Sequence, residues 1–229
     1  MKILAIDTST KFLSLGIYDD GKIYEYNLEV GPKLSSLLIV TISNVLKALE
    51  LELKDLDYFV CGLGPGSFTG LRVGLSAMKG LSWSLNKPLI GVSTLELLAM
   101  NAQGCANKII VPVIDAKRNL IYSCFYRNSG CKLKKMSSYM LVSKDELLKK
   151  IKSSCVMTGD ALSLYKDDIV KSVPEVVLLD KDNWYPKAHN MIKLSLESIK
   201  NKKIKDISKI NPMYIYPKEC QIRTKGMKV

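Results

Sequence analysis

The sequence predicts an α/β protein made of two related halves, each with the element order βββαβαβα. Three observations support this fold class. Strand-like and helical patterns follow one another in the same order twice along the chain. Residues 3–21 can be aligned with residues 111–130 with one inserted residue. The length of 229 residues suits one large domain or two small ones.

The first half shows three strand-like runs followed by alternating helical and strand-like runs. A hairpin signal, Asp19-Asp20-Gly21, joins the second and third runs. The last helix opens with Ser93 and Glu96, which have the spacing of a capping box. Strands are expected at 2–7, 12–18, 22–29, 58–62 and 88–92, and helices at 34–49, 69–85 and from 93.

The second half repeats this order. Its first helix opens with another capping box, formed by Ser143 and Glu146. Strands are expected at 109–115, 120–126, 132–139, 155–158 and 176–179, and helices from 143, near 162 and at 187–200.

The duplication places one aspartate at the end of the first strand of each half, Asp7 and Asp115. Two related domains that face each other would bring both carboxylates into one cleft. The polar link at 101–108 marks the boundary, giving domains 1–103 and 104–229. The basic tail after Lys200 is expected either to pack back on one of the halves or to stay mobile.

Composition limits the function classes. The net charge of +12 suggests a polyanion such as RNA, but only four residues are arginine, so a lysine-rich genome explains the charge equally well. The one histidine, His189, leaves no histidine pair for a metal site and is expected at the surface. Six scattered cysteines and the lack of a signal-peptide core or membrane span predict a reduced, cytoplasmic protein without membrane contact.

The glycine-rich stretch GLGPGSFTGLR, residues 62–72, fits none of three standard site motifs. It lacks the spacing and lysine of a Walker-A loop, the third glycine of a dinucleotide fingerprint, and the glycines that flank serine in a nucleophile elbow. It is therefore interpreted as a tight joint between a strand and a helix, with Ser67 or Thr69 as the helix cap.

The helix after this joint carries small residues at helical spacing, including Gly74 and Gly80. Glycine in a helix interior costs about 1 kcal/mol relative to alanine, so another part of a chain is expected close by. Two alternatives remain: packing on the domain's own sheet, or exposure for a partner. The preceding helix, with consecutive apolar residues at 37–40, favours the partner.

Three segments together resemble the TsaB (YeaZ) family, which is needed to make threonylcarbamoyladenosine in tRNA. They are ILAIDTST at 3–10, GPGSFTGLRVGLSAMKGLSWSLNKPLIGVSTLELLA at 64–99, and VPVIDAKRNLIYSCFY at 111–126. The resemblance spans essentially the whole chain. It implies two ribonuclease-H-like domains of the actin-like, sugar-kinase-like ATPase superfamily.

The resemblance also implies that the superfamily's nucleotide loops are degenerate here. Serine replaces the phosphate-loop glycine, Asp115 is followed by no glycine turn, and one glycine remains of the adenosine-side pair. These loop positions are Asp7, Thr8, Ser9, Thr10, Asp115, Gly159 and Asp160. No catalytic residue, metal site or cofactor of its own is therefore expected, and ATP and metal belong to partner subunits.

The implied role is that of a non-catalytic scaffold for the catalytic paralogue TsaD, joined by the small ATPase TsaE. The family also forms a homodimer when TsaD is absent, and tRNA contact is expected to be indirect or weak. The implied interface lies on the two helices of the first half. Its residues are Leu34, Leu37, Leu38, Thr41, Val45, Gly70, Val73, Gly74, Ala77 and Leu81.

Two other functions were weighed against this one. A free-standing small-molecule kinase or ATPase of the same superfamily would use Asp7 and Asp115 to hold Mg-nucleotide. A peptidase would need a metal cluster or a paired serine and histidine, and the sequence shows neither.

Overall fold

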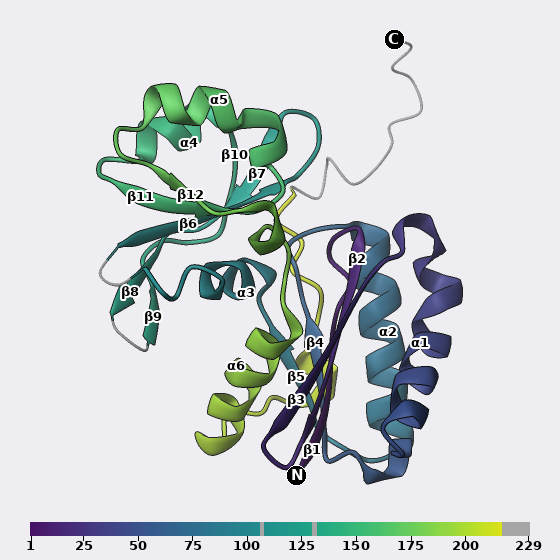
Figure 1. The fold of residues 1–229 in the computed structure, drawn as a ribbon. Helices are drawn as coiled ribbons and strands as arrows, with labels where there is room; N and C mark the ends of the chain where they lie inside the picture. The colour runs from purple at the N-terminus through teal and green to yellow at the C-terminus, as the bar shows by residue number, and fades with distance from the viewer. Residues whose placement is uncertain (106–107, 130–131, 217–229) are drawn as a thin grey trace.

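The computed structural model describes residues 1–105, 108–129 and 132–216, and it contains two β-sheets with helices on both faces (Figure 1). Each sheet is built from one half of the sequence. The predicted α/β fold of two duplicated halves is confirmed, and the halves differ in one inserted hairpin.

The first sheet has the order β3-β2-β1-β4-β5. Its central strand β1 is parallel to β4 and antiparallel to β2, and almost all of its residues are buried. Such continuous apolar strands need cover on both faces. The strands are β1 (Lys2–Asp7), β2 (Phe12–Asp19), β3 (Lys22–Glu29), β4 (Tyr58–Gly62) and β5 (Leu89–Val92).

Three helices supply that cover. Helices α1 (Leu34–Ala48) and α2 (Phe68–Ser84) lie side by side on one face, and α6 (Ala188–Lys200) lies on the other (Figure 1). Because α6 follows the second sheet in sequence, the cover of the first sheet comes from both halves of the chain.

The second sheet repeats the order of the first as β10-β7-β6-β11-β12, with β8 and β9 beside it. The predicted strand at 120–126 is broken at residue 124, and the predicted strand at 132–139 ends early. Phe125 explains the break, because its N–H donates to Ser137 Oγ (3.0 Å) and its carbonyl accepts from Met136 N–H (2.8 Å). The strands are β6 (Ile109–Asp115), β7 (Leu120–Ser123), β8 (Tyr126–Ser129), β9 (Lys132–Lys135), β10 (Met140–Ser143), β11 (Cys155–Thr158) and β12 (Val177–Leu178).

The remaining helices belong to the second sheet. Helices α4 (Lys144–Lys150) and α5 (Leu162–Ser172) lie on its outer face, while α3 (Thr94–Met100) packs on β6 from the inner side (Figure 1). Ser143 and Glu146 form the predicted capping box of α4. Ser93 does not form one at α3, because its hydroxyl makes no cap hydrogen bond. Short 3-10 turns lie at Gly31–Lys33, Leu53–Asp55, Lys181–Asn183 and Ile207–Lys209.

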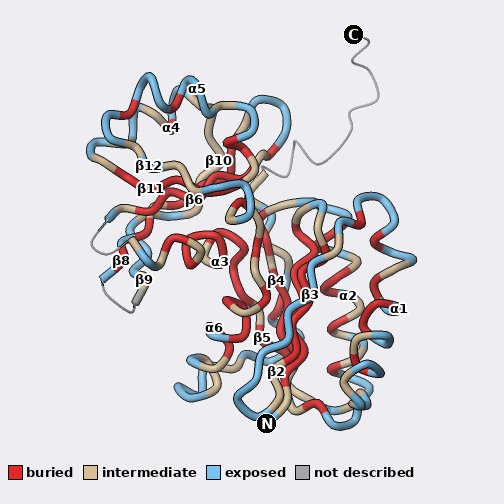
Figure 2. Tube along the Cα trace, viewed as in Figure 1, coloured by how far each residue is buried: buried red, intermediate tan, exposed pale blue. Residues whose placement is uncertain are grey.

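The two halves exchange their last helices. α3 follows the first sheet in sequence but is buried against the second, whereas α6 follows the second and packs on the first (Figure 2). Residues 1–103 and 104–229 therefore each supply one sheet. The two predicted domains are nevertheless not independent packing units, because each sheet is covered by a helix from the other segment.

Hydrogen bonds to Glu25 link the exchanged helix α6 to β3. Glu25 on β3 accepts from the Ala188 N–H (2.5 Å) and lies 2.8 Å from His189 Nδ1. Burial raises the pKa of Glu25, but the hydrogen bond and charge of His189 outweigh burial and hold this pKa below its ordinary value. His189 is thus half-buried and paired, rather than the solvated surface residue that the sequence predicted.

The chain after α6 returns to the first half. Ile207 and Ile210 join its core, and the Met213 N–H donates to the Leu63 carbonyl (2.8 Å). Tyr216 then reaches the second half, where its hydroxyl donates to the Ala116 carbonyl (2.9 Å). The basic residues from 217 to 229 lie outside the described residues.

The sequence also predicted reduced cysteines and no membrane-spanning segment. Cys61, Cys124 and Cys155 are buried and Cys105 is half-buried, all as free thiols, while Cys131 and Cys220 lie outside the described residues. Within the described ranges, no helix is long and apolar enough to cross a membrane.

Candidate functional site

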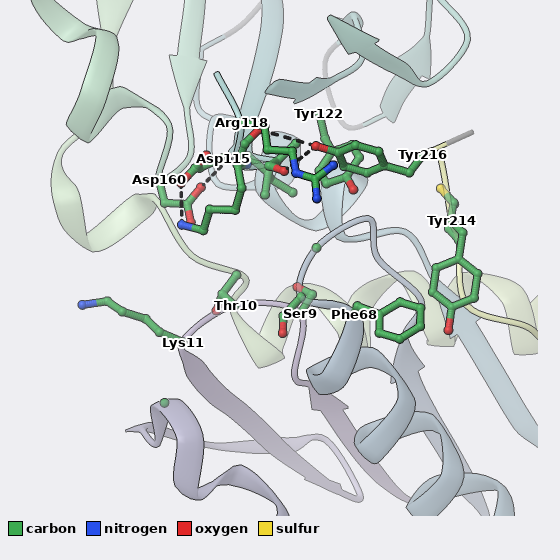
Figure 3. Close-up of a pocket in the computed structure, with 17 residues that line it drawn as sticks. Ser9, Thr10, Lys11, Phe68, Asp115, Arg118, Tyr122, Asp160, Tyr214 and Tyr216 are labelled. Carbon is green, nitrogen blue, oxygen red and sulfur yellow. Dashed lines mark hydrogen bonds and ion pairs between the residues drawn. The ribbon is translucent and has the colours of Figure 1, made fainter. Parts of the chain in front are cut away.

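A cleft of about 690 Å³ lies between the two halves (Figure 3). The β1–β2 connection and the start of α2 form one wall, and the β6–β7 turn and Asp160 form the other. Tyr214 and Tyr216 of the returning segment stand at one end of the cleft (Figure 3). The sequence predicted that the paired carboxylates Asp7 and Asp115 meet in this cleft.

The phosphate-loop aspartate of the first half does not line the cleft. Asp7 is 1% exposed, and its carboxylate accepts from Ser9 N–H (2.8 Å), Ser9 Oγ (2.6 Å) and Thr94 Oγ1 (2.9 Å). Burial raises the pKa of this carboxyl, while the Ser9 and Thr94 hydrogen bonds oppose the rise. All of these partners come from the chain itself, so the carboxylate is sealed beneath its loop.

The glycine-rich stretch makes the seal. A Cβ at Gly62 would lie 2.0 Å from an Asp7 carboxylate oxygen, and one at Gly70 would lie 2.0 Å from the Thr8 carbonyl oxygen. A Cβ at Gly74 would lie 2.1 Å from Thr8 Oγ1. These distances are far below van der Waals contact, so only glycine lets α2 and the end of β4 approach the loop. Of the two alternatives for Gly74, packing on its own domain is correct.

The cap of α2 joins the same arrangement. Ser67 is the cap residue, since its hydroxyl accepts from the Gly70 N–H (3.2 Å), while Thr69 lies inside the helix. The Ser67 N–H donates to the Ser9 carbonyl (2.7 Å), and Thr8 Oγ1 donates to the Gly70 carbonyl (2.8 Å). Residues 7–10 are therefore tied to the first turn of α2 by hydrogen bonds in both directions.

The corresponding loop of the second half is open to the cleft. Asp115 accepts from the Lys117 N–H (2.8 Å) and from Lys117 Nζ (2.6 Å), and its own N–H donates to Asp160 Oδ1 (2.9 Å). Burial raises the pKa of Asp160, and the negative charge of Asp115 adds to the rise. Gly159, next to Asp160 in the chain, packs on the backbone of β6, because a Cβ there would be 2.0 Å from the Val113 carbonyl oxygen.

Three consecutive residues of this open loop have left-handed backbone conformations. Lys117, Arg118 and Asn119 have φ values of 64°, 52° and 59°. Side-chain-bearing residues avoid this region at a cost of about 1 kcal/mol or more each, and such strain is found mainly at functional sites. The strained turn places Arg118 on the wall of the cleft (Figure 3).

Aromatic rings line one end of the cleft. Phe68 and Tyr214 lie with ring centroids 5.2 Å apart, and the guanidinium of Arg72 lies 3.9 Å above the Phe68 ring. On the other wall Tyr122 and Tyr216 pack edge to face at 6.0 Å. Burial raises the pKa of Tyr122 to about 12, so its hydroxyl keeps its proton near neutral pH.

The cleft therefore contains only part of the predicted loop set. Ser9, Thr10, Asp115 and Asp160 line it, whereas Asp7, Thr8 and Gly159 lie buried beneath its walls. The expectation that Asp7 and Asp115 share one space is wrong, because the glycine-rich stretch closes over Asp7. The sequence did not predict Tyr214 and Tyr216 as lining residues, because they are far along the chain from the other residues of the cleft and belong to no motif.

Half of the predicted interface residues are inside the first half. Leu38 is 1% exposed, and the other four of this group are also buried by the chain's own core. These five residues are Leu34, Leu38, Thr41, Gly70 and Gly74. A partner cannot contact them, so the prediction is corrected for these positions. The half-buried remainder, which packs on the outside of the same core, is Leu37, Val45, Val73, Ala77 and Leu81.

The same two helices carry apolar side chains that are exposed. Trp83 on α2 is 83% exposed, and Ile39 and Val40 on α1 are each more than half exposed. A groove of about 500 Å³ runs beside α1 and is lined by Ile39 and by Leu81 of α2. We call Ile39, Val40, Leu81 and Trp83 the α1–α2 surface. Helical periodicity places Trp83 on the same face as Gly80, a signal that the sequence analysis did not use.

The carboxylates of the cleft are engaged by groups of the chain itself. They are held by the chain's own N–H groups and by Lys117, and no described nucleophile stands beside a described histidine base in the cleft. Among the described residues, no group of three or more His, Cys, Asp or Glu is placed to hold a metal ion.

Comparison with known proteins agrees with this description. Residues 29–219 match the model of the family described as "TsaD: tRNA N6-adenosine threonylcarbamoyltransferase". The tRNA threonylcarbamoyladenosine biosynthesis protein TsaB of Bacillus subtilis (strain 168) is 33% identical over 173 residues, which cover 74% of this chain and 75% of that protein. TsaB of Escherichia coli (strain K12) is 27% identical over 222 residues, 94% of each chain.

The structure of YeaZ from Pseudomonas aeruginosa superposes with a TM-score of 0.80 at 21% sequence identity, covering 93% of this chain and 99% of that one. This likeness shows a common fold, and the sequence matches show the family. The chain belongs to the TsaB (YeaZ) family of tRNA threonylcarbamoyladenosine biosynthesis proteins.

Proposed function

We propose that this chain is a non-catalytic subunit of the complex that transfers a threonylcarbamoyl group to tRNA, and that it binds and supports a TsaD-related catalytic subunit in the cytoplasm. The observation that carries the proposal is the sealing of Asp7 and Thr8 beneath the β1–β2 connection. Asp7, which would hold a nucleotide's metal in an active relative of this fold, has all its described hydrogen bonds with the chain itself.

The seal also leaves the loop few groups for a phosphate. The Ser9 N–H is used by Asp7, and the Ser9 carbonyl accepts from Ser67 N–H. A phosphate loop needs free backbone N–H groups that converge on the anion. We therefore infer that ATP and metal are used by the partner subunits, with the TsaE ATPase as a further partner. Tight binding of Mg-ATP by this chain alone would instead favour the kinase alternative.

The α1–α2 surface supports the partner part of the proposal. An almost fully exposed tryptophan on α2 and exposed aliphatic side chains on the neighbouring α1 are unusual on a free surface, and tryptophan is enriched among the residues that dominate binding energy at interfaces. The groove beside α1 gives this surface a shape into which a partner's apolar side chain can insert. The same surface would pair two copies of this chain when the TsaD-related subunit is absent.

Substitution of Trp83 tests the proposal. We expect Trp83→Asp to weaken association with the TsaD paralogue by at least about tenfold, measured by sedimentation velocity or calorimetry, because the variant loses a large apolar contact and buries a charge. The side chain is almost fully exposed, so the thermal stability of the monomer, measured at concentrations too low for two copies to pair, should change little.

Leu164→Asp is the matched control. Leu164 is an exposed apolar residue on α5, on the outer face of the other sheet, so its substitution makes the same kind of change away from the α1–α2 surface. It should leave association unchanged. Equal affinity of the Trp83→Asp variant and the unaltered chain for the partner would overturn the proposed surface.

A further inference from the structure

We propose that the aromatic end of the interdomain cleft binds a single unstacked nucleotide of RNA. The base would lie against Phe68 and Tyr214, and its phosphodiester group would pair with Arg118. The inference rests on the proposed function, since a subunit of a tRNA-modifying complex meets RNA. It goes beyond that function by assigning to this chain a direct contact with RNA and a site.

The first observation is the stack at the start of α2. Phe68 and Tyr214 are 46% and 38% exposed although their rings touch, so each still presents ring surface to solvent. Arg72 is fixed in this stack, since its Nε donates to the Tyr214 hydroxyl (3.1 Å) and its guanidinium covers the Phe68 ring. Exposed aromatic rings with a stacked arginine are the groups on which proteins stack single-stranded bases.

The second observation is the cation on the opposite wall. Arg118 is exposed, and no carboxylate of the described residues forms an ion pair with it. The neighbouring cations differ, because Lys117 is paired with Asp115 and Lys11 is paired with Glu29. Arg118 projects from a turn with three consecutive left-handed residues, a strained backbone of the kind that clusters at functional sites.

The third observation is that the second wall is rigid beside this arginine. The Tyr216 hydroxyl donates to the Ala116 carbonyl, and its ring packs on the edge of Tyr122. Figure 3 shows Arg118 and Tyr216 on one wall and Phe68 and Tyr214 across from them. A nucleotide fits this arrangement, because its planar base can stack on Phe68 and Tyr214 while its phosphate pairs with the Arg118 guanidinium.

The chemistry of the cleft selects the ligand class. A Mg-triphosphate is disfavoured because the Asp7 carboxylate is sealed away from the cleft, whereas one phosphodiester needs only one free cation. A base inside a duplex has both faces covered, so only an unpaired base can stack on Phe68 or Tyr214. Two of the four arginines of the chain, Arg72 and Arg118, stand at this end of the cleft, in a protein whose other cations are mostly lysine.

The test is a binding titration of the full chain with a fluorescent RNA hairpin that carries a single-stranded loop. We expect the hairpin to bind more tightly than a duplex of its stem alone. Tyr214→Ala should weaken binding of the hairpin by at least about fivefold through loss of stacking, and Tyr214→Phe should restore most of it. Arg118→Ala should also weaken binding and should reduce the salt dependence by about 0.7 in the slope of log K against log salt.

Arg127→Ala is the matched control for charge. Arg127 is an exposed arginine on β8, outside the cleft, so this variant loses the same charge without altering the site. It should bind the hairpin like the unaltered chain. Equal losses for Arg118→Ala and Arg127→Ala, or unchanged binding for Tyr214→Ala, would overturn the site.

Association with the TsaD paralogue is measured on the same variants. It should be unchanged by Tyr214→Ala and Arg118→Ala, because neither residue belongs to the α1–α2 surface. Loss of RNA binding together with intact association supports the site. Intact association without any preference for the looped RNA contradicts this inference alone and leaves the proposed function standing.

Discussion

The two halves of this chain carry the same loop in opposite states. In the first half, Asp7 and Thr8 are closed off: both are buried, and glycines on β4 and α2 press against them. In the second half, the turn after Asp115 lies open to the cleft and carries three left-handed residues. One duplicated strand pair has thus produced a sealed structural joint and an exposed, strained turn.

The difference lies in what packs on each loop rather than in the loop itself. Glycines at 62, 66, 70 and 74 let α2 approach the first loop closely enough for hydrogen bonds in both directions. After β11, the corresponding segment offers only Gly159 before α5 begins at Leu162. Closure of a loop in this fold therefore depends on the strand-to-helix joint that follows in sequence.

The largest effect on stability is expected from a substitution that disrupts the packing of α2 on the closed loop of the first half. Gly74→Ala places a methyl group about where Thr8 Oγ1 now lies, and we expect a loss of about 2–3 kcal/mol in the free energy of unfolding. Gly80→Ala is the matched control in the same helix, because nothing lies within 4 Å of the added Cβ. It should stabilise the chain by up to about 1 kcal/mol. Urea unfolding of both variants measures these changes. Similar free energies of unfolding for Gly74→Ala and Gly80→Ala would contradict the close packing of α2 on Thr8.

A second effect concerns pH, because burial raises the pKa of Asp7 above its ordinary value of 3.8. The native state then holds this proton more tightly than the unfolded chain. The stabilisation from this site is complete below about pH 4 and is lost as pH rises through the raised pKa. We expect the stability of the unaltered chain relative to Asp7→Asn to fall over this range in urea titrations. A difference that does not vary with pH would show that Asp7 is not desolvated.

The smallest effect is expected on the open side. Glycine adopts the left-handed conformation of residue 118 without strain, whereas alanine adopts it at an energetic cost. We expect Arg118→Gly to be more stable than Arg118→Ala by about 0.5–1 kcal/mol, because relief of strain exceeds the extra backbone entropy of glycine in the unfolded chain. Thermal unfolding of the two variants measures this difference. A more stable alanine variant would contradict a strained turn.

Much of the fold could be read from the sequence because it follows from local patterns. The apolar runs of β1 and β4 and the hairpin at residues 19–21 appear where they were expected. The split of the strand at 120–126 was missed, because it results from hydrogen bonds to residues 136 and 137, which periodicity does not report. The exchange of α3 and α6 was also missed, since an apolar helix face does not specify which of two sheets it will cover.

The candidate site was less predictable than the fold for the same reason. Sequence identified the loops, the glycine-rich joint and the two helices of the first half. It could not distinguish an apolar residue that faces the chain's own core from one that faces outward, as Leu38 and Trp83 show. Both belong to helices with apolar residues on more than one face, so periodicity alone leaves the direction open.

By itself, the sequence determined the duplicated α/β architecture, the family, and the absence of the standard phosphate and nucleophile motifs, because these depend on residue types at fixed spacings. The tertiary structure alone decided that Asp7 is sealed while Asp115 lies in the cleft, and that Tyr214 returns to meet Phe68. Those outcomes depend on which backbones can approach within a few ångströms of each other. Contacts between segments that are distant in sequence decide that approach.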